Sequence, residues 1–171
     1  MGVKVLVTYA SKYGSTAEIA GKIGEVLRQN GLKTEVLPAK QVRDLGAYHA
    51  VVLGSAVYIG QWRKEAVRFL EKNAEGLAQR ATWIFSSGPT GEGDPVELLQ
   101  GWTFPPKIRP IAESIQPRDI VVFHGNVDVN RLNFLHKWMI DKVESPVGDF
   151  RDWDTIKAWA ESIVDALNGA S

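Results

Sequence analysis

The sequence predicts an α/β fold: a single domain in which a five-stranded, doubly wound parallel sheet lies between two layers of helices. Two observations predict it. Short apolar segments alternate along the chain with longer segments whose apolar residues recur at helical spacing. The first short segment, residues 4–9, is mostly apolar, which is typical of a strand buried on both faces of a sheet. Strands that alternate with helices in this way indicate parallel, doubly wound topology.

Five short segments are expected to form the strands, at residues 4–9, 32–37, 50–53, 81–85 and 120–123. Pro38 is expected to end the second strand, because proline has no N–H group to donate to a sheet. A glycine-containing loop is expected over residues 54–60, directly after the third strand. The carboxyl ends of all five strands should therefore meet at one edge.

Apolar periodicity and end signals predict the helices. The first is expected to begin at Ser15, which forms a capping box with Glu18, and to end at Asn30-Gly31. A second is expected over residues 62–77 and a closing helix over residues 152–168. The inward face of the closing helix is expected to consist of Ile156, Trp159, Ala160, Ile163 and Leu167.

Two segments are longer than simple connections. Residues 86–106 are rich in glycine and proline, and residues 127–150 contain a helix-like stretch at 132–143. Long insertions in compact domains are often functional. The first lies between two strands of one sheet rather than between two cores, so the domain is expected to span residues 1–171.

The charge balance and the absence of cysteine exclude several classes of function. Lys and Arg number 20 and Asp and Glu number 20, so no long-range field favours nucleic acid or anionic lipid. A chain without cysteine forms no disulfide, thiolate metal site or cysteine nucleophile. The first seven residues contain one basic residue and continue into a strand pattern, which predicts no secretory signal and a cytoplasmic protein.

The loop after the first strand is the strongest candidate for a binding site. In an open parallel sheet, ligands bind beyond the carboxyl ends of the strands. This loop, residues 11–16, has three hydroxyl side chains, a glycine at position 14 and the beginning of a helix. Converging N–H groups and the helix dipole favour a phosphate monoester there. The alternative is purely structural, with Ser15 as a cap and Gly14 as a turn residue.

Several other sites lack their sequence motifs. The chain has no G-x-x-x-x-G-K-[ST], no G-x-G-x-x-G after the first strand and no G-x-S-x-G. A response-regulator receiver would need acidic residues after the first and third strands, where Thr8-Tyr9 and Leu53-Gly54 stand instead. The three histidines, His49, His124 and His136, are too scattered for a metal site and are expected in packing or on the surface.

The loop Ser11-Lys12-Tyr13-Gly14-Ser15-Thr16 resembles the phosphate loop of the flavodoxin family, roughly [ST]-x-[ST]-G-x-[ST], with Tyr13 in place of a small hydroxyl residue. The resemblance implies a flavodoxin-like fold and bound FMN. It also implies that two further loops border the isoalloxazine ring. The implied cofactor-binding residues are Ser11, Lys12, Tyr13, Gly14, Ser15, Thr16, Ser55, Ala56, Val57, Tyr58, Ile59, Gly60, Ser86, Ser87, Gly88, Thr90 and Gly91.

A narrower resemblance covers nearly the whole chain and concerns the menaquinone-dependent protoporphyrinogen oxidases of bacterial haem synthesis. It rests on the phosphate loop with Glu18-Ile19-Ala20, on residues 54–60, and on the stretch 132–143 preceding Asp152-Trp153. It implies an FMN oxidoreductase that oxidises protoporphyrinogen and passes the electrons to a quinone, with a peripheral position at the inner membrane face. The alternative is a flavodoxin-type electron carrier whose partner is another redox protein.

Two aromatic residues are candidates for stacking on a flavin ring. Tyr58, in the middle of its loop, is expected to contact the ring, whereas Trp62 is expected to pack as part of a helix or the core. The stretch 132–143 has an apolar stripe that either packs on its own domain or receives a hydrophobic substrate, a quinone or a membrane face. No catalytic acid or base is assigned, because the flavin would supply the redox chemistry.

Overall fold

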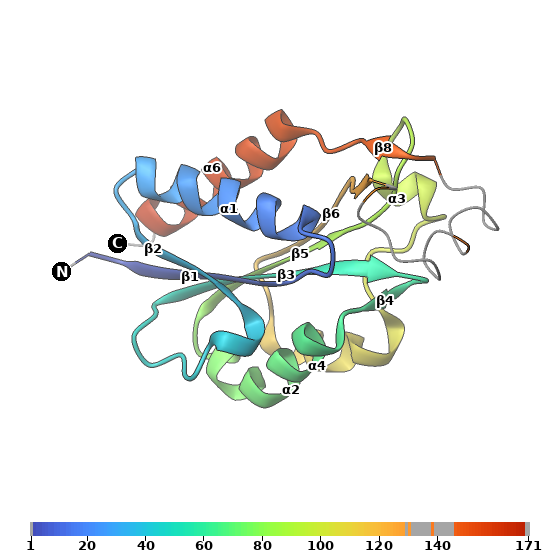
Figure 1. Ribbon diagram of the computed structural model, residues 1–171. Helices are drawn as coiled ribbons and strands as arrows, with labels where there is room; N and C mark the ends of the chain where they lie inside the picture. The colour runs from blue at the N-terminus through green and yellow to red at the C-terminus, as the bar shows by residue number, and fades with distance from the viewer. Residues whose placement is uncertain (1, 129, 131–137, 139–145, 170–171) are drawn as a thin grey trace.

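The computed structural model describes residues 2–128, 130, 138 and 146–169. Five parallel strands form the sheet in the order β2-β1-β3-β5-β6 (Figure 1), which confirms the predicted doubly wound topology. These strands are β1 (Lys4–Ala10), β2 (Lys33–Pro38), β3 (Ala50–Tyr58), β5 (Ala81–Ser87) and β6 (Asp119–Phe123). Short antiparallel pairs add β4 (Gln61–Trp62) to β3 and join β7 (Asn126–Val127) to β8 (Gly148–Asp149).

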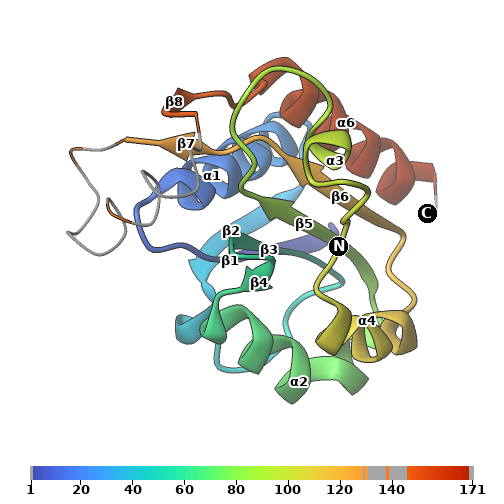
Figure 2. The ribbon, with the colours of Figure 1, turned by 90° about the vertical axis from the view of Figure 1, so that its right-hand side faces the viewer.

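Helices cover both faces of the sheet. They are α1 (Ser15–Gln29), α2 (Lys64–Ala78), α3 (Pro95–Leu98), α4 (Arg109–Ile115) and α6 (Trp153–Gly169), with 3-10 turns η1 (Ala39–Gln41) and η2 (Pro106–Ile108). Helices α1 and α6 lie on one face, and α2 and α4 lie on the other (Figures 1 and 2). The result is a three-layer α/β/α domain.

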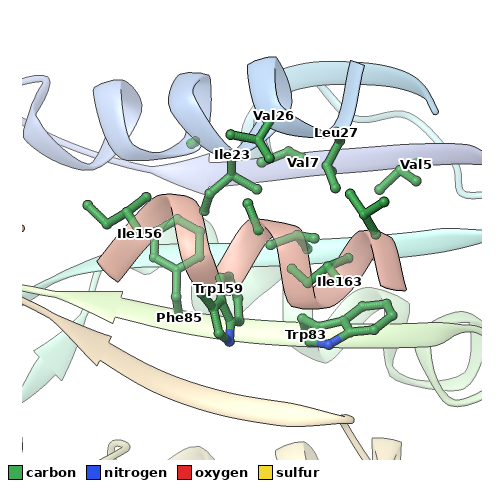
Figure 3. Close-up of a cluster of buried hydrophobic side chains, with 14 of the residues drawn as sticks. Val5, Val7, Ile23, Val26, Leu27, Trp83, Phe85, Ile156, Trp159 and Ile163 are labelled. Carbon is green, nitrogen blue, oxygen red and sulfur yellow. The ribbon is translucent and has the colours of Figure 1, made fainter. Parts of the chain in front are cut away.

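Side-chain alternation along the strands divides the core into two clusters. On β1, Val5 and Val7 pack under α1 and α6, while Leu6 packs toward α2. Figure 3 shows the first cluster around α6, where Trp159 points toward β5. All five residues predicted on the inward face of the closing helix are buried. Burial of this apolar stripe fixes α6 against the sheet.

The capping box predicted at Ser15 is wrong. Gly14 is the N-cap residue of α1, with φ of 92°, and no side chain caps this helix end. Ser15 is the first helical residue, and the Glu18 carboxylate pairs with Arg151 instead. The first turn of α1 therefore presents its N–H groups without a side-chain acceptor.

The predicted loop over residues 54–60 is mostly strand, because β3 continues to Tyr58. Residues 54 and 55 pair with β1 on one side, and residues 54–56 pair with β5 on the other. Only Ile59 and Gly60 form the turn. Trp62 was expected to begin the second helix, but it belongs to β4 instead.

The predicted helix at 132–143 lies outside the described residues, apart from the exposed Trp138. Within the part of the chain that the structure describes, no helix combines the length and apolar character needed to cross a bilayer.

Candidate functional site

Four loops meet at the carboxyl edge of the sheet, which Figure 2 views directly. They follow β1, β3, β5 and β6, and they contain every residue for which cofactor contact is expected, together with the strand ends that precede them. The edge is therefore assembled from segments far apart in sequence.

The phosphate loop, residues 11–16, joins β1 to α1. The N–H group of Gly14 donates to the Ser11 hydroxyl at 3.1 Å, which closes the loop on itself. The left-handed conformation of Gly14 turns the chain into the helix, a backbone geometry that a side chain would strain. With no side-chain cap on α1, the helix dipole and first-turn amides are available to an anion.

The hydroxyl groups of this loop differ in what they contact. The Ser15 hydroxyl oxygen is buried and has no hydrogen-bond partner among the residues that the structure describes. Thr16 Oγ1, in contrast, lies 3.1 Å from Ser87 Oγ in the interior and joins the phosphate loop to the end of β5. A buried hydroxyl without a hydrogen-bond partner costs about 1–3 kcal/mol of folding free energy. A bound oxyanion would give the Ser15 hydroxyl the partner that it lacks.

The second segment is a tight β3–β4 hairpin. Ile59 and Gly60, at its turn, have φ of 51° and 69°, the pattern of a two-residue type I′ turn. A β-branched residue in this conformation is an outlier, and the Ile59 side chain is 79% exposed. The hairpin thus presents a strained apolar tip at the site.

Tyr58 lies at the base of that tip and is half-buried. Its ring contacts the Tyr13 ring edge-on at 6.4 Å between centroids, and the Arg63 guanidinium lies 5.7 Å from its centroid. Burial is the main cause that raises the pKa of Tyr58 to about 12. The Tyr58 ring is therefore a neutral aromatic surface beside the phosphate loop, consistent with the stacking role expected for it.

Trp62 packs in the core, as expected for this residue. It is buried against Phe104, with ring centroids 4.9 Å apart, and its indole N–H donates to Ser86 Oγ at 2.8 Å. Ser55 is likewise buried, and its hydroxyl accepts the backbone N–H of Arg63 at 3.0 Å. The Ser55 and Ser86 side chains thus hold the hairpin in place, and the backbones of both residues pair within the sheet.

The segment after β5 is fastened to the segment after β6. Gly88 donates to the Phe123 carbonyl at 3.3 Å, and Gly125 donates to the Pro89 carbonyl at 2.9 Å. A Cβ on Gly125 would lie 2.9 Å from the Gly88 carbonyl oxygen, so only glycine allows this approach. His124 adds contacts from its two ring nitrogens to the carbonyls of Pro89, at 3.2 Å, and Gly93, at 2.7 Å.

The other predicted residues of this segment have structural contacts of their own. The Thr90 hydroxyl donates to the Pro146 carbonyl at 2.6 Å and so joins the two insertions. Gly91 has φ of 114°, and Gly88 approaches Val57 of the hairpin closely. Residues 55–60 and 86–91 therefore form neighbouring walls. Ala56, in the first of these walls, is buried in β3.

Two cavities open beside these walls. One, of about 320 Å³, is lined by Tyr58 and residues 61–65. The other, of about 270 Å³, lies between the phosphate loop and the segment after β2, where Lys12 and Lys40 line it. Both include Glu65. Among the described residues no group of three or more His, Cys, Asp or Glu is placed to hold a metal ion.

Sequence reasoning missed three residues that shape this edge. His124 and Gly125 fasten the loops after β5 and β6, and Arg151 reaches the first turn of α1. A positively charged residue between two acidic ones, Asp149 and Asp152, was the only local signal for Arg151. The partners of His124 and Gly125, and the contacts of Arg151 with α1, are distant in sequence, so periodicity and motif spacing contain no information about them.

Comparison with known proteins agrees with this architecture. A model of the flavodoxin domain family matches residues 6–154. No curated protein matches the chain.

Several solved structures share the fold. A flavodoxin from the domain Archaea is 14% identical, with a TM-score of 0.61 over 97% of this chain and 99% of that one. The Streptococcus pneumonia TIGR4 flavodoxin is 16% identical, with a TM-score of 0.61 over 99% of this chain and 100% of that one. The Flv1 flavodiiron core from Synechocystis sp. PCC6803 is 13% identical, with a TM-score of 0.65 over 99% of this chain and 37% of that one. At such identities the likeness concerns the fold alone.

Proposed function

The chain belongs to the flavodoxin domain family, whose cofactor is FMN, and on that premise we propose that its carboxyl edge binds FMN non-covalently and transfers electrons between redox partners. The phosphate is held by residues 11–16, and the isoalloxazine ring lies between residues 55–60 and residues 86–91. One observation carries the proposal: α1 begins without a side-chain cap, and the buried Ser15 hydroxyl beside this helix end has no partner.

The phosphate end of the site would be built mainly from neutral donors. The amides of the first turn of α1 and the Ser15 hydroxyl supply hydrogen bonds, and the helix dipole favours the negative charge. Lys12 is exposed, with its ammonium 5.4 Å from the Tyr13 ring centroid, and adds one positive charge at the mouth of the loop. Hydrogen bonds to a charged acceptor contribute about 1.5–3 kcal/mol each.

The ring end of the site would be built from an aromatic surface and backbone groups. Tyr58 offers an uncharged ring for stacking, and Thr90 and Gly91 offer backbone amides at the opposite wall. Bound FMN supplies the one- and two-electron redox chemistry, and the protein positions it and sets the polarity around it. The zero net charge of the chain supplies no long-range attraction toward a charged partner, so partner recognition has to be local.

Flavin binding is tested by the absorbance of the purified protein after it is mixed with excess FMN and passed through a desalting column. We expect a flavin spectrum that stays with the protein, because the phosphate is caught by several donors at once. Riboflavin, which lacks the phosphate, is the control and should be largely removed by the column. A protein that remains colourless with FMN would contradict the proposal.

A second candidate function is oxidation of protoporphyrinogen with a quinone as acceptor, as the narrower resemblance implies. The favourable observation is that the large apolar side chains most exposed among the described residues come from the hairpin turn and the two insertions. They are Ile59, Leu98, Trp138 and Val147. Exposed apolar surface of this kind suits a hydrophobic substrate or a membrane face better than a charged protein partner.

Turnover distinguishes the two candidates. If the FMN-loaded protein is an oxidase of this type, oxidation of protoporphyrinogen should proceed faster than the spontaneous reaction, and a menaquinone analogue should accelerate it further. FMN alone at the same concentration is the control. Equal rates with the protein and with free FMN would leave electron transfer to a protein partner as the function.

A further inference from the structure

The Arg151 side chain connects the C-terminal part of the chain to the phosphate loop. It lies between β8 and α6 in sequence, and only 5% of it is exposed. Its Nη1 donates to the Ser15 carbonyl oxygen at 3.3 Å and to the Glu18 carboxylate at 2.6 Å. Both acceptors belong to the first turn of α1, more than 130 positions away in the sequence.

Asp149 holds the guanidinium in this position. Nε and Nη2 of Arg151 donate to the two carboxylate oxygens of Asp149, at 2.8 Å and 2.7 Å, which is the bidentate arrangement that arginine favours. The Trp153 ring lies against the guanidinium, 4.7 Å from its carbon to the ring centroid. The hydrogen bond from Arg151 is the main cause that lowers the pKa of Asp149, so the pair stays ionised at neutral pH.

The contact with Ser15 acts on the part of the backbone that an anion would touch. The Ser15 carbonyl belongs to the same planar peptide unit as the Thr16 N–H, and the two groups point in opposite directions. Fixing the carbonyl therefore fixes the amide. The same turn contains the buried Ser15 hydroxyl that has no partner.

We propose that Arg151 is a positioning residue for the flavin phosphate: braced by Asp149, it holds the first turn of α1 so that the Ser15 hydroxyl and the Thr16 amide face the phosphate. This rests on the proposed function. Arg151 does not supply its charge to the phosphate, because Asp149 and Glu18 already neutralise it. A lysine has three donors on a flexible stem and cannot hold Asp149, Glu18 and the Ser15 carbonyl together in this geometry.

The test compares FMN and riboflavin, since only FMN has the phosphate. Dissociation constants of the Arg151→Met and Arg151→Lys variants are measured by flavin fluorescence quenching. We expect FMN affinity to fall about tenfold or more in both variants, the size of one lost charge-assisted interaction, with riboflavin affinity within about twofold of wild type. The matched control is Arg118→Met, because Arg118 also lies over a tryptophan ring, that of Trp83, but precedes β6 at the opposite edge.

The outcomes separate this inference from the proposed function. If Arg151→Met weakens FMN and riboflavin equally, Arg151 only stabilises the fold, and the positioning role is wrong. If both variants keep the wild-type preference for FMN, the inference is also wrong, while FMN binding stands. If the wild-type protein binds neither flavin, or does not distinguish them, the proposed phosphate site itself fails.

Discussion

The Gly54→Ala variant is expected to lose about 3 kcal/mol of the free energy of unfolding, the upper part of the usual range for overpacking a core. Gly54 is buried in the middle of β3 and pairs with Phe85 of β5. A Cβ on Gly54 would lie 2.0 Å from the Phe85 ring, so the ring would have to move. It has no room to do so, because Phe123 and Trp159 lie against it with centroids 5.8 Å and 6.1 Å away.

Urea unfolding followed by circular dichroism measures this effect. The control is Gly21→Ala on α1, where a new Cβ meets nothing within 4 Å and alanine should stabilise the helix by up to about 1 kcal/mol. Replacing the Phe85 ring by the smaller leucine side chain, in the double variant Gly54→Ala/Phe85→Leu, should restore part of the lost stability. If Gly54→Ala is as stable as the wild type, the packing of Phe85 over β3, close to α6 in Figure 3, is not as described.

Gly54 also shows why the sequence misled the prediction of β3. Glycine is rare inside strands, and a strand followed by glycine favours a loop. Here the glycine is needed because the aromatic side chain of the neighbouring strand covers it. That reason lies in the tertiary structure, so local sequence could not reveal it. The five strands themselves could be predicted, because four of them contain an apolar run that stands out without its neighbours and the second is ended by Pro38.

The helices follow the same rule. The closing helix α6 could be predicted with its inward face, because five apolar residues at helical spacing define a stripe whatever the stripe packs against. The capping box failed although Ser15 and Glu18 stand at the right spacing. Arg151 competes for the Glu18 carboxylate, and the helix begins one residue earlier than a cap at Ser15 requires, because Gly14 is the N-cap residue. The short helix α4, packed on α2, was not assigned at all.

The candidate site divides in a similar way. The loop between β1 and α1 could be predicted, because a strand, a hydroxyl-rich turn and a helix start are contiguous in sequence. The contacts that hold the site together could not, since Thr16 meets Ser87 and Arg151 meets Ser15 only after folding. The sequence therefore led to the proposal of a phosphate site at this loop, and the structure shows that its Ser15 hydroxyl has no partner among the described residues.

Because the Ser15 hydroxyl has no partner among the described residues, the second large effect, on FMN affinity, is expected for Ser15→Ala. We expect FMN affinity to fall by about 1.5–3 kcal/mol, roughly 10- to 150-fold, because a hydrogen bond to a charged acceptor is lost. Riboflavin affinity should stay within about twofold of wild type. The measurement is flavin fluorescence quenching, and Ser114→Ala on α4, where the hydroxyl donates to the Ile111 carbonyl at 2.7 Å, is the matched control.

The apoprotein should respond to Ser15→Ala with the opposite sign. Removing a buried hydroxyl that has no partner relieves its desolvation cost, and alanine is the better helix former, so the flavin-free protein should become more stable by about 1 kcal/mol. If the Ser15 hydroxyl served only to stabilise the fold, its removal would lower the stability of the apoprotein. If Ser15→Ala destabilises the apoprotein, or leaves FMN affinity unchanged, this hydroxyl is not the group that binds the phosphate.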